Sequence, residues 1–256
     1  MIQFEIIEGV GKITLNRPDK YHAFVREMAL QLQEILDKCN DNKSVRAILI
    51  TATGKAFCAG QDLSEATDPN GPALTQIVQD HYNPIIRKIR NIEKPIVAAV
   101  NGVAAGAGAS IALCCDIVVA CESATFIQAF SKIGLIPDSG GTFFLPRLIG
   151  MQKAAALMMT AEPVSAKDAE KMGMIYKVFS DDSFVEESWK LVSKLAGMPT
   201  KGLGLTKRLL NASYSNNLEE QLDMEDKCQT IAGNTADFKE GIEAFFEKRI
   251  PNFKGE

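Results

Sequence analysis

The stretch KPIVAAVNGVAAGAGASIALCCDIVVA spans residues 94–120 and decides the fold class. It contains an apolar strand (96–100), a glycine-rich segment that runs into a helix (106–114), and a second apolar strand (116–120). Strands that are apolar along their whole length are typical of a sheet covered on both faces. The alternation of such strands with helices indicates an α/β architecture.

The sequence on either side extends this pattern. The elements expected before it are strands at 2–6 and 13–15, a helix over 26–40, a strand over 47–51, a surface loop over 64–72, and a helix from about residue 74 that Pro84 kinks or restarts. After about residue 190 the strands stop, and helices are expected over 204–214, 217–232 and 235–248. This helical layer packs either on its own body or on a neighbouring subunit.

Composition narrows the function. The formal net charge of -4 argues against nucleic acid as the main partner, because nucleic-acid-binding surfaces are usually basic. No apolar run is long enough to cross a bilayer, and the first residues alternate like a strand instead of resembling a signal segment. We therefore expect a cytoplasmic protein with no membrane partner.

The cysteines and histidines give no metal site. The six cysteines lack CxxC spacing, and His22 and His81 are the only histidines. A zinc cluster of the usual spacing cannot be assembled from this set. Buried free thiols in a reducing compartment are the simplest interpretation.

Three glycine-rich segments follow predicted strands: GKAFCAGQDL (54–63), NGVAAGAGAS (101–110) and GLIPDSGG (134–141). Small residues at the start of a helix leave main-chain N–H groups free, and the helix dipole favours an anionic oxygen there. Two such segments side by side could hold one oxyanion. Each alone is equally well explained as a chain reversal.

Two known motifs can be rejected. Gly106 and Gly108 resemble the start of a dinucleotide fingerprint, but Ile111 stands where the third glycine belongs. Asp138-Ser139-Gly140 resembles a serine-protease loop, which would need a histidine base on a β-barrel. On spacing alone, Asp138 is a turn former or a partly desolvated general base flanked by apolar residues.

The order and spacing of several segments resemble the crotonase superfamily over nearly the whole chain. The segments are RPDKYHAF (17–24), AFCAGQDL (56–63), residues 94–117, GLIPDSGGTFFLPRLIG (134–150), SAKDAEKMGMIYKV (165–178) and AFFEKRIPNFKGE (244–256). The resemblance implies a spiral of ββα turns over 1–195, which binds acyl-CoA, and a helical oligomerisation region over 196–256. It also implies a homotrimer or a hexamer built as a dimer of trimers.

The resemblance also implies a site. The oxyanion hole of the superfamily maps to the main-chain N–H groups of Gln61 and Ala107. The residues implied to border the substrate and its CoA are Lys20 and Tyr21 at the adenine end, Lys248 near the phosphates, and Ala59, Gly60, Asp62, Leu63, Gly106 and Phe130. His22 stands where many members have asparagine. No metal or separate cofactor is implied, because coenzyme A is part of the substrate.

The catalytic residues favour isomerisation over hydration. The two glutamates with which hydratases activate water align with Ser110 and Phe130, whereas Asp138 aligns with the acidic residue of several isomerases. An apolar wall around Phe130 and Phe143 is expected to exclude water. Segments such as HYNPIIRKI (81–89) and KGLGLTKRLLNA (201–212) resemble the 1,2-epoxyphenylacetyl-CoA isomerases, whose relatives also shift double bonds in linear enoyl-CoA. The alternatives are an enoyl-CoA hydratase and a noncatalytic acyl-CoA-binding subunit.

Overall fold

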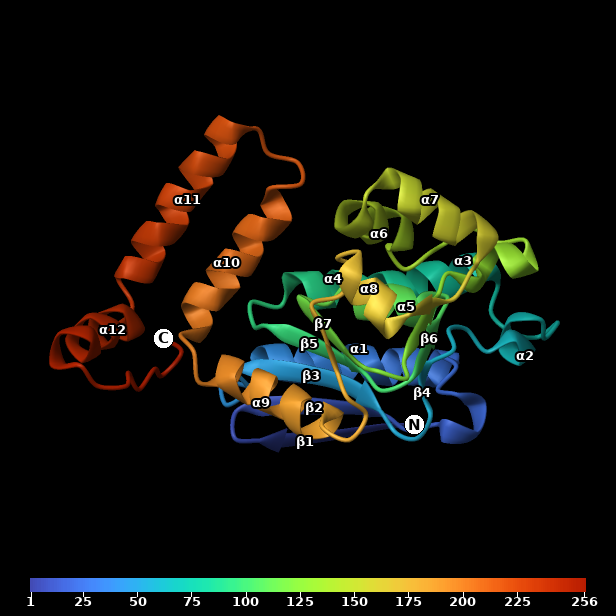
Figure 1. Ribbon diagram of the computed structural model, residues 1–256, viewed down its shortest axis with the longest axis horizontal. Helices are drawn as coiled ribbons and strands as arrows, with labels where there is room; N and C mark the ends of the chain where they lie inside the picture. Colours follow the sequence, from blue (N-terminus) through green and yellow to red (C-terminus); the bar gives the residue numbers. More distant parts are fainter.

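The long strands form one six-stranded sheet in the computed structural model, which describes all 256 residues (Figure 1). Their order is β1 (Ile2–Ile7), β2 (Val10–Leu15), β3 (Ala47–Ala52), β5 (Ile96–Val100), β7 (Ile117–Cys121) and β10 (Lys177–Phe179). Only β1 and β2 pair antiparallel, and the other four pairs are parallel. The predicted α/β class is confirmed.

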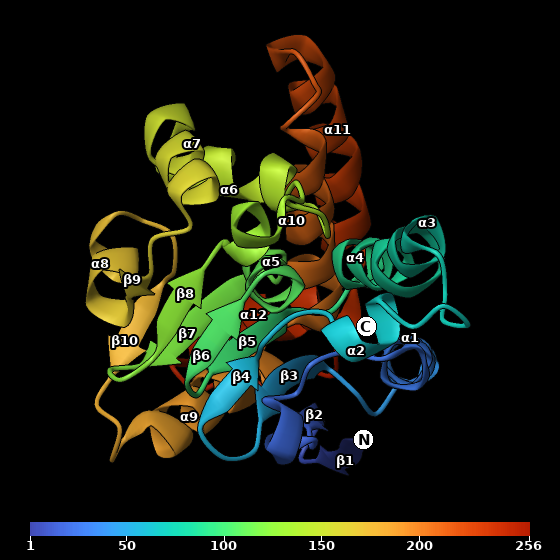
Figure 2. The ribbon, with the colours of Figure 1, turned by 90° about the vertical axis from the view of Figure 1, so that its right-hand side faces the viewer.

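A second sheet of very short strands lies beside the first (Figure 2). It consists of β4 (Ala56–Cys58), β6 (Val103–Ala105), β8 (Thr125–Ile127) and β9 (Val164–Ser165), of which β4, β6 and β8 run parallel. Each long strand β3, β5 and β7 is followed by a short strand and then by helix, which is the expected spiral of ββα turns. Strands β4 and β6 lie inside the glycine-rich segments 54–63 and 101–110.

The helices of the first half cover the sheets and mostly match the expected ranges. They are α1 (Arg26–Asp41), α2 (Leu63–Ala66), α3 (Leu74–Gln76), a π-helical turn (Ile77–Tyr82), α4 (Asn83–Asn91) and α5 (Ala107–Leu113). The expectation of a loop over 64–72 is wrong at its start, because Asp62 accepts a hydrogen bond from the Ser64 N–H and caps the single turn of α2. Pro84 does restart the helix, since it sits in the first turn of α4.

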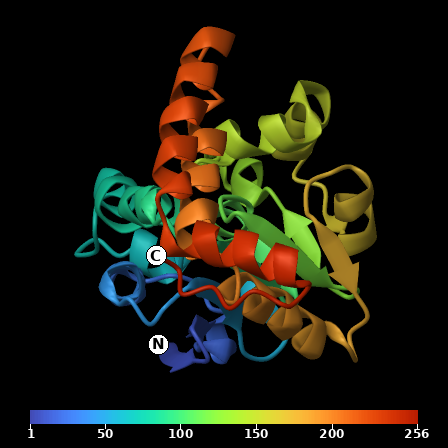
Figure 3. The same ribbon diagram turned by 90° about the vertical axis from the view of Figure 1, so that its left-hand side faces the viewer.

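The second half of the chain is mostly helical. It contains α6 (Gly141–Ile149), α7 (Met151–Thr160), α8 (Ala166–Lys171), α9 (Phe184–Ala196), α10 (Thr200–Ala212), α11 (Leu218–Gly233) and α12 (Ala236–Glu247). The three C-terminal helices are confirmed, although α10 begins four residues before the expected start. Helices α10 and α11 form an antiparallel pair that stands away from the sheets, and α12 runs across its base (Figures 1 and 3).

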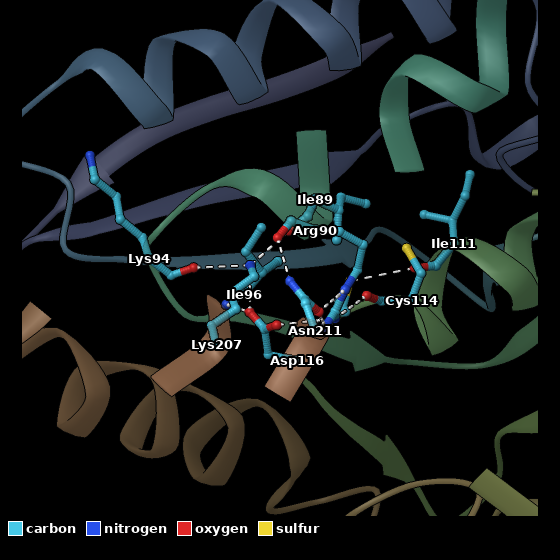
Figure 4. Close-up of polar contacts among 10 residues, drawn as sticks. Ile89, Arg90, Lys94, Ile96, Ile111, Cys114, Asp116, Lys207 and Asn211 are labelled. Atoms are coloured by element: carbon cyan, nitrogen blue, oxygen red, sulfur yellow. Dashed lines mark hydrogen bonds and ion pairs between the residues drawn. The ribbon is translucent and has the colours of Figure 1, made fainter. Parts of the chain in front are cut away.

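A buried ionic network joins α10 to the sheet body (Figure 4). Lys207 Nζ on α10 lies 2.8 Å from Asp116 Oδ2, and Arg90 on α4 lies 3.1 Å from the other carboxylate oxygen of Asp116. Arg90 also donates to the side chain of Asn211 on α10. Charges of both signs therefore meet where α4, β7 and α10 converge, and they fix the direction in which the C-terminal helices leave the body.

Three further features bear on function. No helix combines the length and the apolar character that a bilayer span requires. All six cysteines are buried and free, as expected. Nowhere do three His, Cys, Asp or Glu side chains come together in a way that could hold a metal ion.

Candidate active site

Gln61 and Ala107 come from two adjacent glycine-rich segments. A Cβ built on Gly60 would lie 3.3 Å from the nitrogen of Ala107, so the residue before Gln61 lies directly against the start of α5. Gly60 can approach this closely because it has no side chain, and its φ of +93° suits glycine. The structure therefore brings the two predicted oxyanion segments together.

The N–H groups of both residues are available for a ligand. Gln61 forms a parallel bridge with Phe24, in which the Phe24 N–H donates to the Gly60 carbonyl and the Asp62 N–H donates to the Phe24 carbonyl. This pairing leaves the Gln61 N–H pointing away from Phe24. Ala107 is the first residue of α5, so its N–H has no acceptor within the helix. The arrangement suits an oxygen that gains negative charge.

The Phe130 ring lies on one side of the two N–H groups. A Cβ on Gly106 would lie 3.9 Å from the Phe130 ring, and both residues are buried. The ring comes from a 3₁₀ turn (Ala129–Ile133) that follows β8. It contributes apolar surface beside the two N–H groups, as predicted. Phe143 does not complete the wall: it is 42% exposed and packs on Tyr214 and Arg147.

Asp138 begins a tight turn that leads into α6. The Gly141 N–H donates to the Asp138 carbonyl at 2.8 Å, and Ser139 and Gly140 both have positive φ, as in a type I′ turn. The Ser139 hydroxyl donates to Asp138 Oδ1 at 2.9 Å and orients the carboxylate. Asp138 is thus the turn former that its sequence suggests, and its side chain is still free to react through the other oxygen.

Burial raises the pKa of the Asp138 carboxyl above the ordinary value for aspartate, although the Ser139 hydroxyl and the residue's own N–H act in the opposite direction. The burial does not come from the apolar neighbours that we expected to supply it. Leu135 and Ile136 are exposed, Ile136 to 77%. The carboxylate instead lies beside the buried Ser139 of its own turn, and its charge helps to raise the pKa of the buried Tyr82.

Below the turn lies a buried polar pair. A Cβ on Gly141 would lie 2.8 Å from Ser110 Oγ and 3.6 Å from Gln128 Oε1, and neither oxygen has a hydrogen-bond partner. Ser110 lies at the first of the two positions where hydratases carry glutamate, and Phe130 lies at the second. Both positions are therefore buried, Ser110 beside the Asp138 turn and Phe130 beside Gly106, and neither offers a carboxylate.

The remaining predicted residues of the 59–63 segment differ in exposure. Ala59 and Leu63 are exposed, whereas Asp62 is buried. The Asp62 carboxylate accepts from Arg17 at 2.7 Å and from the Ser64 N–H. Burial raises the pKa of Asp62, but the hydrogen bonds from Arg17 and Ser64 and the charge of Arg17 together outweigh it, so the net pKa is lowered. This carboxylate is therefore occupied within the protein.

Lys20 and Tyr21 lie on the surface next to this segment. The Ala59 N–H donates to the Tyr21 carbonyl at 2.9 Å, and both side chains of the 20–21 pair are exposed. Lys248 is not brought to them. It follows α12 directly, and α12 lies at the opposite end of the long axis from α2 (Figure 1).

A cavity of about 740 Å³ lies elsewhere in the structure. It is formed by strands β1–β3 and α9, with Thr14, Thr51 and Trp189 in its wall, and none of the predicted site residues lines it. The candidate site is therefore defined by its chemical groups: two outward N–H groups, a half-buried carboxylate and an aromatic cover.

Sequence reasoning missed two residues that contact Gln61. The Tyr82 hydroxyl donates to Gln61 Oε1 at 2.9 Å, and Gln61 Nε2 donates to Glu65 at 3.0 Å. The available signal was the proline at position 84, which marks a disturbed helix just after Tyr82.

Comparison with known proteins places the chain in a family. Residues 5–256 match the family model for enoyl-CoA hydratase/isomerase. The chain is 46% identical over 251 residues to the 1,2-epoxyphenylacetyl-CoA isomerase of Escherichia coli, covering 97% of this chain and 96% of that protein. It is 41% identical over 255 residues to a probable enoyl-CoA hydratase of Rhodobacter capsulatus, covering 99% and 98%.

The fold agrees with solved structures. The crystal structure of an enoyl-CoA hydratase/isomerase from Mycobacterium abscessus superposes with a TM-score of 0.95 at 34% identity, covering all of both chains. The ββα spiral, the matched family model and these relatives lead to one conclusion. The chain belongs to the enoyl-CoA hydratase/isomerase family of the crotonase superfamily.

Proposed function

We propose that the protein is an acyl-CoA isomerase that works through a thioester enolate. Asp138 removes a proton from the acyl skeleton and returns it at another carbon. The N–H groups of Gln61 and Ala107 hold the thioester oxygen while it carries negative charge. No metal or redox cofactor is needed for these steps, because they consist of proton transfers and the stabilisation of one oxyanion.

The half-buried carboxylate of Asp138 is the observation that carries this proposal. A base works best when its pKa approaches the working pH, and burial moves the pKa of Asp138 in that direction. The two N–H groups supply the other half of the chemistry, since losing one such donor typically costs about 3 kcal/mol of transition-state stabilisation.

Isomerisation is favoured over hydration by the residues at the two positions where hydratases carry glutamate. Addition of water needs groups that hold and deprotonate it, and Ser110 and Phe130 provide no second carboxylate. Ser110 has ordinary basicity, and the Phe130 ring is apolar. A single acid–base group suits a reaction in which one proton leaves a carbon and returns to another.

For the substrate, we propose a ring 1,2-epoxyphenylacetyl-CoA, a linear 3-enoyl-CoA, or both. The similarity to the isomerase of Escherichia coli supports the first. A shift of a double bond from the β,γ to the α,β position uses the same proton removal next to the thioester, which supports the second. Lys20, Tyr21 and the exposed residues of the 59–63 segment would border the CoA portion.

An oligomer is part of this proposal. Phe245 and Phe246 near the end of α12 are 78% and 77% exposed, and Ile250 beyond it is 90% exposed. Monomers rarely leave such residues together in water, so a second copy of the chain is the natural cover. We infer a trimer or hexamer, in which Lys248 serves a neighbouring subunit because it lies far from the site of its own chain.

A panel of CoA esters tests the function. The wild-type protein would be given the ring epoxide, a 3-enoyl-CoA and crotonyl-CoA, and the products would be identified by mass and by proton spectra. We expect double-bond migration or ring rearrangement to exceed water addition to crotonyl-CoA. Faster hydration would make the protein a hydratase, and tight binding of CoA esters without any turnover would make it a binding subunit.

A further inference from the structure

The helix that precedes Asn83 widens into a π-helical turn over Ile77–Tyr82. The cause is Pro84, which has no N–H to donate and whose ring crowds the carbonyl four residues earlier, that of Asp80. The helix accommodates the proline with a hydrogen bond that spans five residues instead of four: the Asn83 N–H donates to the carbonyl of Val78. Single π turns of this kind are frequent at functional sites.

Another helix stabilises the widened turn. Gln33 Nε2 on α1 donates to the carbonyl oxygens of Asp80 and His81, at 2.8 and 3.1 Å. The two residues that end the turn, His81 and Tyr82, are both buried, and Tyr82 is fully inaccessible to solvent. The turn therefore holds Tyr82 rigidly in the interior.

Tyr82 reaches the candidate site through its hydroxyl. Its ring packs on Phe24 with centroids 5.9 Å apart, and its hydroxyl donates to Gln61 Oε1 at 2.9 Å. Burial raises the pKa of Tyr82 well above its ordinary value, and the charge of Asp138 adds to this effect. The phenol therefore stays protonated and acts as a hydrogen-bond donor.

The other end of the Gln61 carboxamide is held as well. Gln61 Nε2 donates to Glu65 Oε2 at 3.0 Å, and the carboxylate of Glu65 accepts from the N–H of Arg26 at the start of α1. Both polar atoms of the Gln61 side chain thus have partners on elements that are fixed to the core. The side chain of Gln61 is therefore fixed at both polar atoms.

Contacts of the backbone and of the Gln61 side chain together fix the plane of the peptide bond between Gly60 and Gln61, which carries the Gln61 N–H. The parallel bridge to Phe24 holds the Gly60 carbonyl and the Asp62 N–H, and Tyr82 packs on the same Phe24. Rotation of the Gln61 N–H away from Ala107 would have to break the bond from Tyr82, the bond to Glu65 or the bridge.

We propose that Tyr82 is a positioning residue, which acts through the side chain of Gln61 to aim its main-chain N–H at the thioester oxygen. This rests on the proposed function, since it assumes that the Gln61 N–H stabilises the enolate. Tyr82 itself does not touch the substrate, because its side chain is covered on all sides. It would act mainly in the transition state, where the oxygen carries the most charge.

The test is a double-mutant cycle on the full-length protein. Tyr82→Phe removes only the hydroxyl and keeps the ring on Phe24. Gln61→Met removes the side-chain hydrogen bonds with Tyr82 and Glu65 but keeps the main-chain N–H. The kcat and KM for 3-enoyl-CoA isomerisation would be measured for each variant and for the double variant. Tyr176→Phe is the matched control, since the Tyr176 side chain is 64% exposed and its hydroxyl makes no hydrogen bond within the protein.

We expect each single variant to lose about tenfold in kcat with KM within about twofold, because small errors in the alignment of a catalytic group are costly. The double variant should lose no more than either single one, because both changes break the same link. A wild-type kcat in Tyr82→Phe, or a double loss equal to the product of the single losses, would overturn the proposal. A merely structural defect would instead lower thermal stability and raise KM.

Three further outcomes are separated by design. If Tyr82→Phe does not fold, Gln61→Met carries the test alone, since its side chain is only partly buried. If Asp138→Asn keeps full activity, the proposed function fails whatever Tyr82 does. If Asp138→Asn is inactive and both Tyr82→Phe and Gln61→Met have a wild-type kcat, only the positioning role of Tyr82 is refuted.

Discussion

Gly108 on α5 lies directly against the main chain of Cys58 on β4. A Cβ built on Gly108 would stand 2.4 Å from the Cys58 carbonyl oxygen, well inside any tolerated contact, and the opposing atoms include backbone. The first turn of α5 can pack this closely on the neighbouring strand only without a side chain at this position. The distance between the two glycine-rich segments, and so between the Gln61 and Ala107 N–H groups, depends on this contact.

Gly108→Ala should therefore damage both stability and activity. We expect a loss of about 2 kcal/mol or more in the free energy of unfolding, as for other overpacked interiors, and a large fall in kcat. Gly233→Ala is the matched control: it lies at the end of α11 with open space around it and should be neutral or slightly stabilising. Urea unfolding of both variants checks this, and equal stabilities would contradict it.

The pH dependence of activity should follow Asp138. As the pH falls through its pKa, the carboxylate takes a proton and can no longer accept one from the substrate. Because burial raises this pKa, the acid limb of the kcat profile should lie above that of an ordinary aspartate. Initial rates between pH 4 and 8 measure it, after the protein has been shown to stay folded over that range. An acid limb at the position for exposed aspartate would argue against a buried base.

The ionised carboxylate of Asp138 should serve catalysis but lower the stability of the fold at neutral pH. The folded state binds the proton of this carboxyl more tightly than the unfolded state does, so ionisation at neutral pH opposes folding. Asp138→Asn keeps the acceptor for the Ser139 hydroxyl and removes this cost. We expect its melting temperature at pH 7 to equal or exceed that of the wild type. A clear decrease would show that the carboxylate has a stabilising role instead.

The two histidines should make the fold sensitive to acid. His22 and His81 are both buried, and burial lowers the pKa of each side chain. For His22, a hydrogen bond to the Thr53 carbonyl acts in the opposite direction. They stay neutral in the folded state, whereas in the unfolded chain they take up protons below about pH 6.5. The free energy of unfolding should therefore fall as the pH drops below about 6.5. Urea unfolding at pH 7.5 and 5.5 tests this. We expect His22→Asn to reduce the difference in the free energy of unfolding between the two pH values.

The charged side chains of the network around Asp116 should differ in how much each contributes to the free energy of unfolding. Asp116→Asn leaves the buried Lys207 and the partly buried Arg90 near each other without their anion, which should cost about 3 kcal/mol. Lys207→Met leaves Asp116 paired with Arg90 and should cost clearly less. Comparison of their urea midpoints decides this, and a smaller loss for Asp116→Asn than for Lys207→Met would contradict it.

The sequence predicts the parts of the fold that repeat a simple period. Strand β3 is apolar except for Thr51, and α1 buries Met28, Leu32 and Leu36 at helical spacing, so the letters alone predict both elements. The strands β4, β6 and β8 are not predicted, because three residues are too few to show alternation and their pairing is decided by the neighbouring strand.

The candidate site was only partly predictable for the same reason. Two glycine-rich segments after strands suggested two N–H groups, and the structure places them together. The environment of Asp138 depends on tertiary packing: the flanking Leu135 and Ile136 turn outward, and the carboxylate instead lies beside a buried residue of its own turn. The bond from Tyr82 to Gln61 joins residues 21 positions apart across a π turn, and no local pattern encodes it.

The most direct measurement is the single-turnover rate of double-bond migration in a 3-enoyl-CoA, determined side by side for the wild type and Asp138→Asn, with the dissociation constant of each measured separately. If Asp138 is the acid–base group, the variant should bind the thioester about as tightly and react at least about a thousandfold more slowly. A folded Asp138→Asn protein that reacts at close to the wild-type rate would contradict the account.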